Sequence, residues 1–306
     1  MDIITGKVSK IRDCINHPWK KALLLSDKNY WRMLCASMDV IEDTQQGINH
    51  YFYLPDFSAN NGGYLFLYGL LQCFFVQQDA VSNLNQSLLG TQIEWRLNSD
   101  MHNIRELRND AIGHPTGRRN QSFHFLTRIS IRKDSFDIMS LGAKSSGTKH
   151  IKLQDIKQIQ EGSIILILDN ILNHLKIEFM EHKDKFKGQN LMSLIPTTFG
   201  YYVEKVYEGI YSDHPLASMH LDLIKKTHQS IKDGISERYG GSDVLESVKL
   251  ITDKIDYVLD KMSAYFTNGE IFQDKDAEVF FDAFKGYFEE LKGIIFEIDE
   301  EFTACQ

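Results

Sequence analysis

Apolar residues recur every three or four positions along most of this 306-residue chain, which is the spacing of one buried face of an α-helix. The clearest stretches predict long helices over residues 27–53, 64–89 and 153–186. Residues 1–25 are expected to form a short helix or an extended arm. The same spacing continues to the end of the chain and predicts four more helices, over residues 191–211, 215–238, 242–267 and 274–303. The protein should therefore be mainly α-helical.

The period changes to two between residues 122 and 141, where apolar and polar side chains alternate as in a half-buried β-strand. His124, Arg128 and Arg132 would share the outer side of this strand. The polar residues 133–135 predict a turn, after which a short strand returns. We therefore expect a small β-hairpin inserted among the helices.

These elements predict a mainly α-helical bundle with a small inserted β-hairpin, followed by a second helical region. The expected first domain covers residues 1–187 and contains the hairpin at about 122–141. The polar, glycine-containing residues 187–190 make the best boundary. Residues 188–306 then form a helical C-terminal domain, which carries no motif that suggests a role.

The stretch after residue 90 predicts one more helix, over residues 91–112, with a capping box at Thr91 and Gly90 ending the preceding helix. Its apolar stripe comprises Ile93, Leu97, Met101, Ile104 and Leu107. Gly113 and Pro115 should stop the helix. Arg108 and Asn109 would then lie in its last turn, and His114 just past its end.

These three side chains suit phosphate chemistry. Arg108 offers a planar, permanently charged group to a phosphodiester. His114 can act as a general acid or base near neutral pH, and Asn109 can orient either of the other two. The alternative is a surface arginine and a helix-terminal histidine that favours the helix dipole.

The stretch from Leu107 to Thr116 resembles the signature of the HEPN superfamily, in which an arginine is followed by a polar residue, often asparagine, and after four to six residues by a histidine. The segment 68–81 also resembles the preceding helix of bacterial HEPN proteins, and the likeness extends over about residues 28–120. Many HEPN proteins are metal-independent ribonucleases of toxin–antitoxin, abortive-infection and CRISPR systems. The resemblance implies that two protomers join their motifs in one cleft. Members silenced by AMPylation carry tyrosine at the position of Thr116, so that regulation is not expected here.

Charge is distributed unevenly. The whole chain has a net charge of -8, whereas residues 101–152 hold ten basic and four acidic residues, a net +6, and the rest therefore carries −14. A basic surface beside the motif is what an RNA backbone requires. The expected RNA-binding residues are Arg105, Arg118, Arg119, Arg128 and Arg132. The alternative is a solvated strand face next to an unrelated turn.

Together these features favour a HEPN-type endoribonuclease with Arg108, Asn109 and His114 as catalytic residues, acting as a toxin or in antiviral defence by abortive infection. It would need no cofactor or metal ion, would form a homodimer, and could have an antitoxin or defence-system partner. The start lacks a secretory signal, and the longest apolar run is too short for a membrane span, so we expect a cytoplasmic protein without membrane association. Two alternatives remain: a non-catalytic HEPN-like module that binds RNA, a nucleotide or a protein, and a helical scaffold with an accidental motif.

Overall fold

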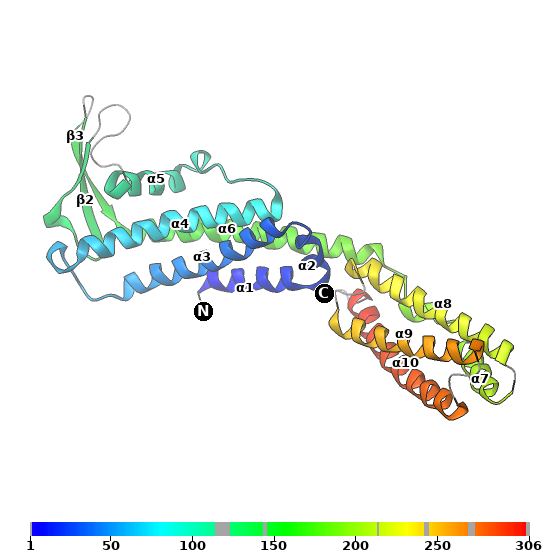
Figure 1. Cartoon of the computed structure of the whole chain (residues 1–306). Coiled ribbons are helices and arrows are strands. Elements are labelled where there is room, and N and C mark those ends of the chain that lie inside the picture. Colours follow the sequence, from blue (N-terminus) through cyan, green and yellow to red (C-terminus); the bar gives the residue numbers. More distant parts are fainter. Residues whose placement is uncertain are drawn as a thin grey trace. The chain divides into compact units, whose positions relative to one another are not determined.

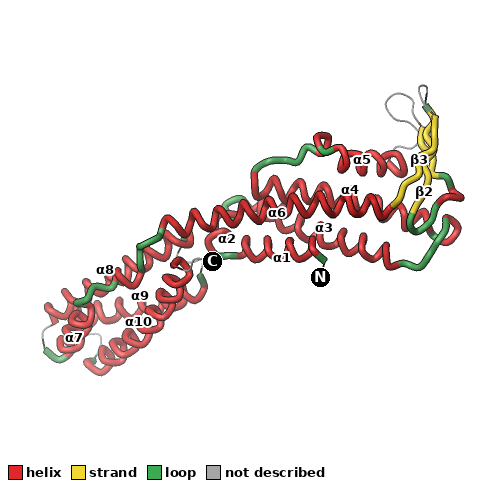
Figure 2. Tube along the Cα trace, turned by 180° about the vertical axis from the view of Figure 1, so that it is seen from behind, coloured by secondary structure: helices red, strands yellow, loops and turns green. Residues whose placement is uncertain are grey.

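The computed structural model describes residues 2–113, 123–142, 146–212, 214–241, 245–268 and 273–303. Within them lie ten α-helices and a three-stranded antiparallel sheet (Figures 1 and 2), so the predicted mainly helical fold with a small inserted sheet is confirmed. The chain divides into two compact units. Unit 1 comprises Met1–Ile15 and Asp27–Lys176, and unit 2 comprises Asn16–Ser26 and Ile177–Gln306.

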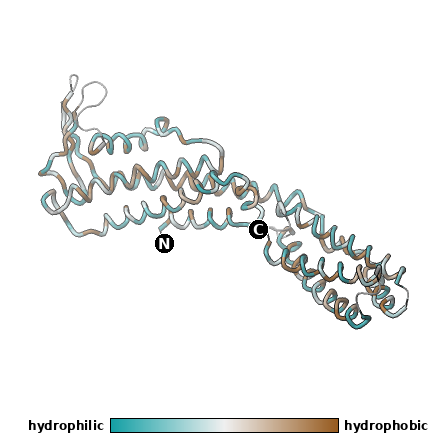
Figure 3. Tube along the Cα trace, viewed as in Figure 1, coloured by the Kyte–Doolittle hydropathy of each residue, from teal (hydrophilic) through white to brown (hydrophobic). Residues whose placement is uncertain are grey.

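Unit 1 is built on long helices whose inner faces are apolar. Its helices are α1 (Ile3–Asn16), α3 (Lys28–Tyr53), α4 (Gly63–Leu89), α5 (Ser99–Arg108) and the first part of α6 (Leu153–Lys185). Figure 1 shows α3 beside α4, and α5 lying along α4. Hydrophobic and hydrophilic residues are interspersed along these helices (Figure 3), as the predicted spacing of three to four residues between apolar positions requires.

Glutamine side chains cross the apolar core of unit 1. Gln77, Gln78 and Gln160 are completely buried, and Gln45 is almost so. Gln77 donates to Gln45 at 2.9 Å, Gln160 donates to Gln77 at 3.1 Å, and Gln78 donates to Gln160 at 2.8 Å. Since a buried amide must be hydrogen-bonded, this chain fixes how α3, α4 and α6 are placed against one another.

The helix that carries the motif begins later than predicted. Thr91 does not cap it, because Thr91 receives hydrogen bonds from Asn85 at the end of α4. The Asn98 side chain accepts from the Met101 amide at 3.1 Å and so starts α5. The predicted apolar stripe is correspondingly wrong at Leu97, which is 87% exposed, whereas Met101, Ile104 and Leu107 are buried. Gly90 does end α4 in a left-handed conformation, with φ of 73°.

The predicted hairpin is a three-stranded sheet with the order β1-β2-β3. Its strands are β1 (Phe123–Leu126), β2 (Ser135–Leu141) and β3 (Ser146–Lys152). The third strand was not predicted, because Ile151 is its one buried residue and its sequence shows no apolar alternation.

The first strand is also shorter than predicted. After Leu126 the backbone forms a 3-10 turn, η4 (Arg128–Ser130), in which the Ser130 hydroxyl accepts from the Asp137 amide at 2.8 Å. The expectation that Arg128 and Arg132 share a strand face with His124 is therefore wrong. Ile129, which the alternation placed inward, is 82% exposed.

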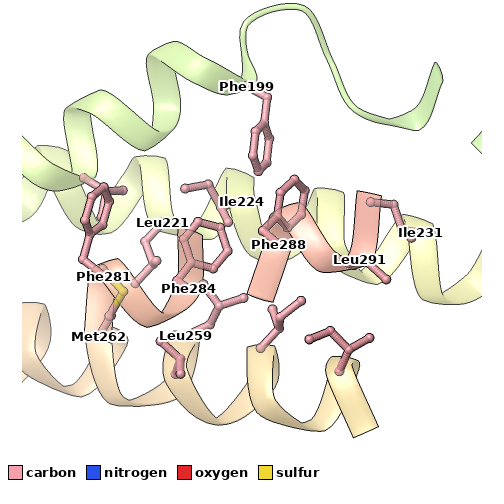
Figure 4. Packing of buried hydrophobic residues seen from close by; sticks show 14 of the residues in the cluster. Phe199, Leu221, Ile224, Ile231, Leu259, Met262, Phe281, Phe284, Phe288 and Leu291 are labelled. Atoms are coloured by element: carbon pink, nitrogen blue, oxygen red, sulfur yellow. The ribbon is translucent and has the colours of Figure 1, made fainter. Parts of the chain in front are cut away.

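Unit 2 is entirely helical in the described residues. It contains α2 (Pro18–Leu24), α7 (Phe199–Ile210), α8 (His214–Tyr239), α9 (Glu246–Asn268) and α10 (Asp274–Thr303), together with a short 3-10 turn, η5 (Leu191–Leu194). Figure 4 shows the aromatic centre of its core, where the Phe199 and Phe288 rings stack with centroids 4.5 Å apart. A Cβ on Gly209 would lie 2.2 Å from that of Ala217, so α7 can approach α8 only with glycine there.

Candidate functional site

The motif lies where α5 ends against α4. Met101, Ile104 and Leu107 bury one face of α5, and this leaves Arg108 and Asn109 at its end partly accessible. Beyond Arg108 the chain continues as a π-helical segment, η3 (Asn109–Gly113), with Ala111 buried. Such wide turns are rare and occur often at functional sites.

Arg108 is held in place by α4. Its Nε and Nη2 atoms both donate to Oε1 of Gln72, at 3.1 and 3.0 Å. Its guanidinium carbon lies 4.6 Å from the centre of the Phe75 ring, a cation–π contact. Its Nη1 atom donates to Oδ1 of Asn109 at 3.1 Å. Described residues thus engage three of the five N–H groups of this guanidinium, a group whose fork of donors suits a phosphate.

Arg105 lies one turn earlier on the same side of α5. Its guanidinium carbon is 3.9 Å from the centre of the Phe75 ring, so Phe75 contacts both arginines. Its Nη1 atom pairs with Oδ1 of Asp79 at 2.8 Å and lies 3.5 Å from Oε1 of Gln78. The ion pair with Asp79 restrains the Arg105 side chain and offsets part of its positive charge. This differs from the expected role of Arg105 as an arginine that binds RNA.

Asn109 connects Arg108 to a groove. Its Oδ1 atom accepts from Arg108, and its Nδ2 atom lies 3.5 Å from Oε1 of Glu106. The groove beside it has a volume of about 610 Å³ and is lined mainly by polar residues of α4, α5 and the loop between them. Phe75, Arg96 and His102 are among its walls. The groove thus places aromatic, basic and amide groups beside Asn109.

The other side of η3 faces the sheet. His124, on β1, is 12% exposed, and its Nε2 atom lies 3.5 Å from Oδ1 of Asp110. Its Nδ1 atom lies 3.0 Å from the hydroxyl of Ser140, the residue opposite it on β2. An imidazole therefore joins the sheet to the residue that follows Asn109.

The structure brings together some of the predicted site residues. Arg105, Arg108 and Asn109 lie side by side on α5 and η3, whereas His114, Arg118 and Arg119 lie outside the described residues. Arg128 and Arg132 are both exposed near η4, where Arg128 donates to Oδ1 of Asn60 at 2.9 Å.

Sequence reasoning missed the α4 residues of the site, Gln72, Phe75 and Asp79. They recur at spacings of three and four, so they lie on one helix face. That spacing was the signal in the sequence that could have grouped them. His124 was noticed only as a strand residue beside two arginines, not as a partner of Asp110.

Comparison of the chain with models of known protein families, with curated proteins and with solved structures found no match. Among the described residues, no helix is long and apolar enough to cross a membrane. In the same part of the chain, no three histidine, cysteine or acidic side chains cluster as metal ligands would.

Proposed function

We propose that this protein is a HEPN-type endoribonuclease that cleaves RNA without a metal ion, as a toxin or an anti-phage effector. The observation that carries the proposal is the restraint on Arg108. A surface arginine without a role would be free to move, but this one is fixed by Gln72, Phe75 and Asn109. Fixing a charged fork before the substrate arrives is what stabilisation of a transition-state charge requires.

In the proposed reaction the RNA 2′-hydroxyl attacks the adjacent phosphorus. The new O2′–P bond forms and the P–O5′ bond breaks, which leaves a 2′,3′-cyclic phosphate and a 5′-hydroxyl. His114 accepts the 2′-hydroxyl proton or delivers a proton to the departing 5′-oxygen. Arg108 binds the charge that grows on the phosphorane oxygens, and Asn109 orients Arg108.

Two protomers would supply the complete site. The motif supplies one histidine per chain, which is sparse for a reaction with two proton transfers, so we propose a homodimer whose motifs face each other across one cleft. A two-fold arrangement is the commonest for homo-oligomers. The groove beside Asn109 would receive a nucleotide next to the scissile phosphate, and the exposed Arg128 and Arg132 would contact the RNA backbone further away.

The test is incubation of the purified protein with total RNA in EDTA. The wild-type protein should cleave RNA, whereas Arg108→Ala and His114→Ala should lose activity by a factor of about 10² or more while remaining folded. Arg32→Ala, which removes an exposed arginine of α3, is the matched control and should cleave normally. RNA binding without cleavage by the wild type would instead favour a non-catalytic HEPN-like module.

A further inference from the structure

Within the described residues, the side chain of His124 in the sheet lies against that of Asp110 in the motif segment. Antiparallel pairing places His124 opposite Ser140, so the hydroxyl contact at Nδ1 follows directly from the register. The opposite ring nitrogen, Nε2, reaches Asp110 in η3. The imidazole thus lies between a residue of β2 and one of the motif segment, only two positions after Arg108.

The contact between His124 and Asp110 contributes little to the free energy of folding. The Asp110 side chain is 23% exposed and that of His124 12%, so both lose much of their hydration. Pairing largely sheltered ionisable groups gains little free energy of folding over apolar packing, because desolvation opposes the attraction. What such a pair does provide is a defined geometry.

That geometry matters because Asp110 is next to Asn109. Asn109 accepts a hydrogen bond from Nη1 of Arg108, so a shift of η3 would move the group that orients the guanidinium. An acidic side chain this close to a phosphate-binding arginine would also repel the phosphate or compete for the arginine. The imidazole of His124 lies beside that carboxylate, with Nε2 3.5 Å from Oδ1 of Asp110.

We infer that His124 is a positioning residue of the motif: through Asp110 it sets η3 and thereby the side chains of Asn109 and Arg108. The role of this geometry in RNA cleavage rests on the function proposed above. A displacement of a catalytic group by about 1 Å can lower a rate by about 10². His124 can therefore affect the reaction strongly without touching the RNA.

The experiment compares three substitutions that keep different parts of the contact. His124→Gln places an amide where Nε2 was and can still reach Asp110, whereas His124→Asn can reach only Ser140, and His124→Ala reaches neither. The matched control is His150→Gln, because His150 pairs with Asp137 at 2.7 Å on the same sheet but is largely exposed. Each variant is measured for kcat and KM on RNA and for its melting temperature.

We expect kcat per folded molecule to fall about tenfold to a hundredfold in His124→Ala and His124→Asn, with KM little changed, and to recover in large part in His124→Gln. His150→Gln should match the wild type. Full kcat in His124→Asn would overturn the inference. The inference would also be overturned if, in all three variants, the decrease in activity were explained entirely by a smaller fraction of folded protein.

A second measurement does not depend on cleavage. In ¹H–¹⁵N NMR spectra, the Arg108 Nε–H and the Asn109 side-chain amide should shift in His124→Asn and in Asp110→Asn, but not in His150→Gln. Unmoved signals in both variants would overturn the positioning role. If the wild-type protein does not cleave RNA, the proposed function fails, and these signals alone decide whether His124 sets the motif.

Discussion

Gln72 on α4 accepts two hydrogen bonds from Arg108 on α5, from Nε at 3.1 Å and from Nη2 at 3.0 Å. These two bonds take up the side of the guanidinium formed by Nε and Nη2, while Nη1 donates to Asn109. They also assign a role in the site to a residue 36 positions earlier in the chain. The orientation of Arg108 thus depends on how α5 packs on α4.

The first prediction concerns this contact. Gln72→Ala should lower kcat for RNA about tenfold, because a hydrogen bond to a charged group contributes roughly 1.5–3 kcal/mol and Arg108 would lose its fixed direction. Gln86→Ala, further along α4 and away from Arg108, is the control. Steady-state kinetics on a short RNA checks both. Equal rates in the two variants would mean that Gln72 does not orient Arg108.

The second prediction concerns the composite site. Arg108→Ala and His114→Ala should each be inactive alone, but a mixture of the two should regain part of the wild-type rate. Mixed dimers would still hold one arginine and one histidine in the shared cleft. The rate is measured after subunit exchange, with light scattering to establish the oligomeric state. A monomer, or a mixture that stays inactive, would contradict a shared cleft.

Much of the fold followed from periodicity, since α3, α4 and α6 lie within about a residue of their predicted bounds. The start of α5 did not, because the capping box was placed at Thr91, whereas Asn98 caps the helix. The choice depended on Asn85, whose side chain engages Thr91 across the loop. Local patterns could not show that contact.

For the candidate site, as for the fold, the sequence predicted the local helix positions but not the tertiary contacts. The placement of Arg108 and Asn109 near the end of a helix followed from the apolar spacing and the helix-stopping residues after it. The contacts of Arg108 with Gln72 and Phe75 depend on how two helices cross, and the contact of His124 with Asp110 depends on the register of a sheet. Both are tertiary features that one sequence does not specify.

The third prediction concerns the buried glutamines. Gln160 donates to the Phe74 carbonyl and to Gln77, and accepts from Gln78. Gln160→Ala should therefore lower the free energy of unfolding by about 3 kcal/mol, because the Phe74 carbonyl, Gln77 and Gln78 would each lose a hydrogen bond in the buried core. Urea unfolding provides the measurement, with the exposed Gln158→Ala of the same helix as the control. A loss below 1 kcal/mol would show that the network adds little.

The fourth prediction concerns pH and unit 2. Burial lowers the pKa of His228, which is 2% exposed, and this outweighs the opposing effect of Asp256, whose Oδ1 atom lies 3.0 Å from Nε2. Lys232, which pairs with the same carboxylate, lowers the pKa further. Burial likewise lowers the pKa of His182.

The sign follows from these shifts. Below the unfolded pKa of about 6.5 the unfolded chain takes up protons that the folded chain does not, so stability present above that pH is lost as the pH falls toward the folded values. Protection of the α8 amides from hydrogen exchange, corrected for intrinsic rates, should decline from about pH 7.5 to about pH 5.5. The decline should be smaller in His228→Gln. An equal decline in protection in His228→Gln would mean that titratable groups other than His228 cause the loss of stability.

The most direct test of the proposed function is the chemistry of the RNA ends. A synthetic RNA is incubated with the protein in EDTA, and the products are analysed by mass spectrometry. We expect a 2′,3′-cyclic phosphate on one fragment and a 5′-hydroxyl on the other, both absent with Arg108→Ala. Fragments that carry a 3′-hydroxyl and a 5′-phosphate, or the same cyclic ends at the same rate with Arg108→Ala, would contradict the proposed function.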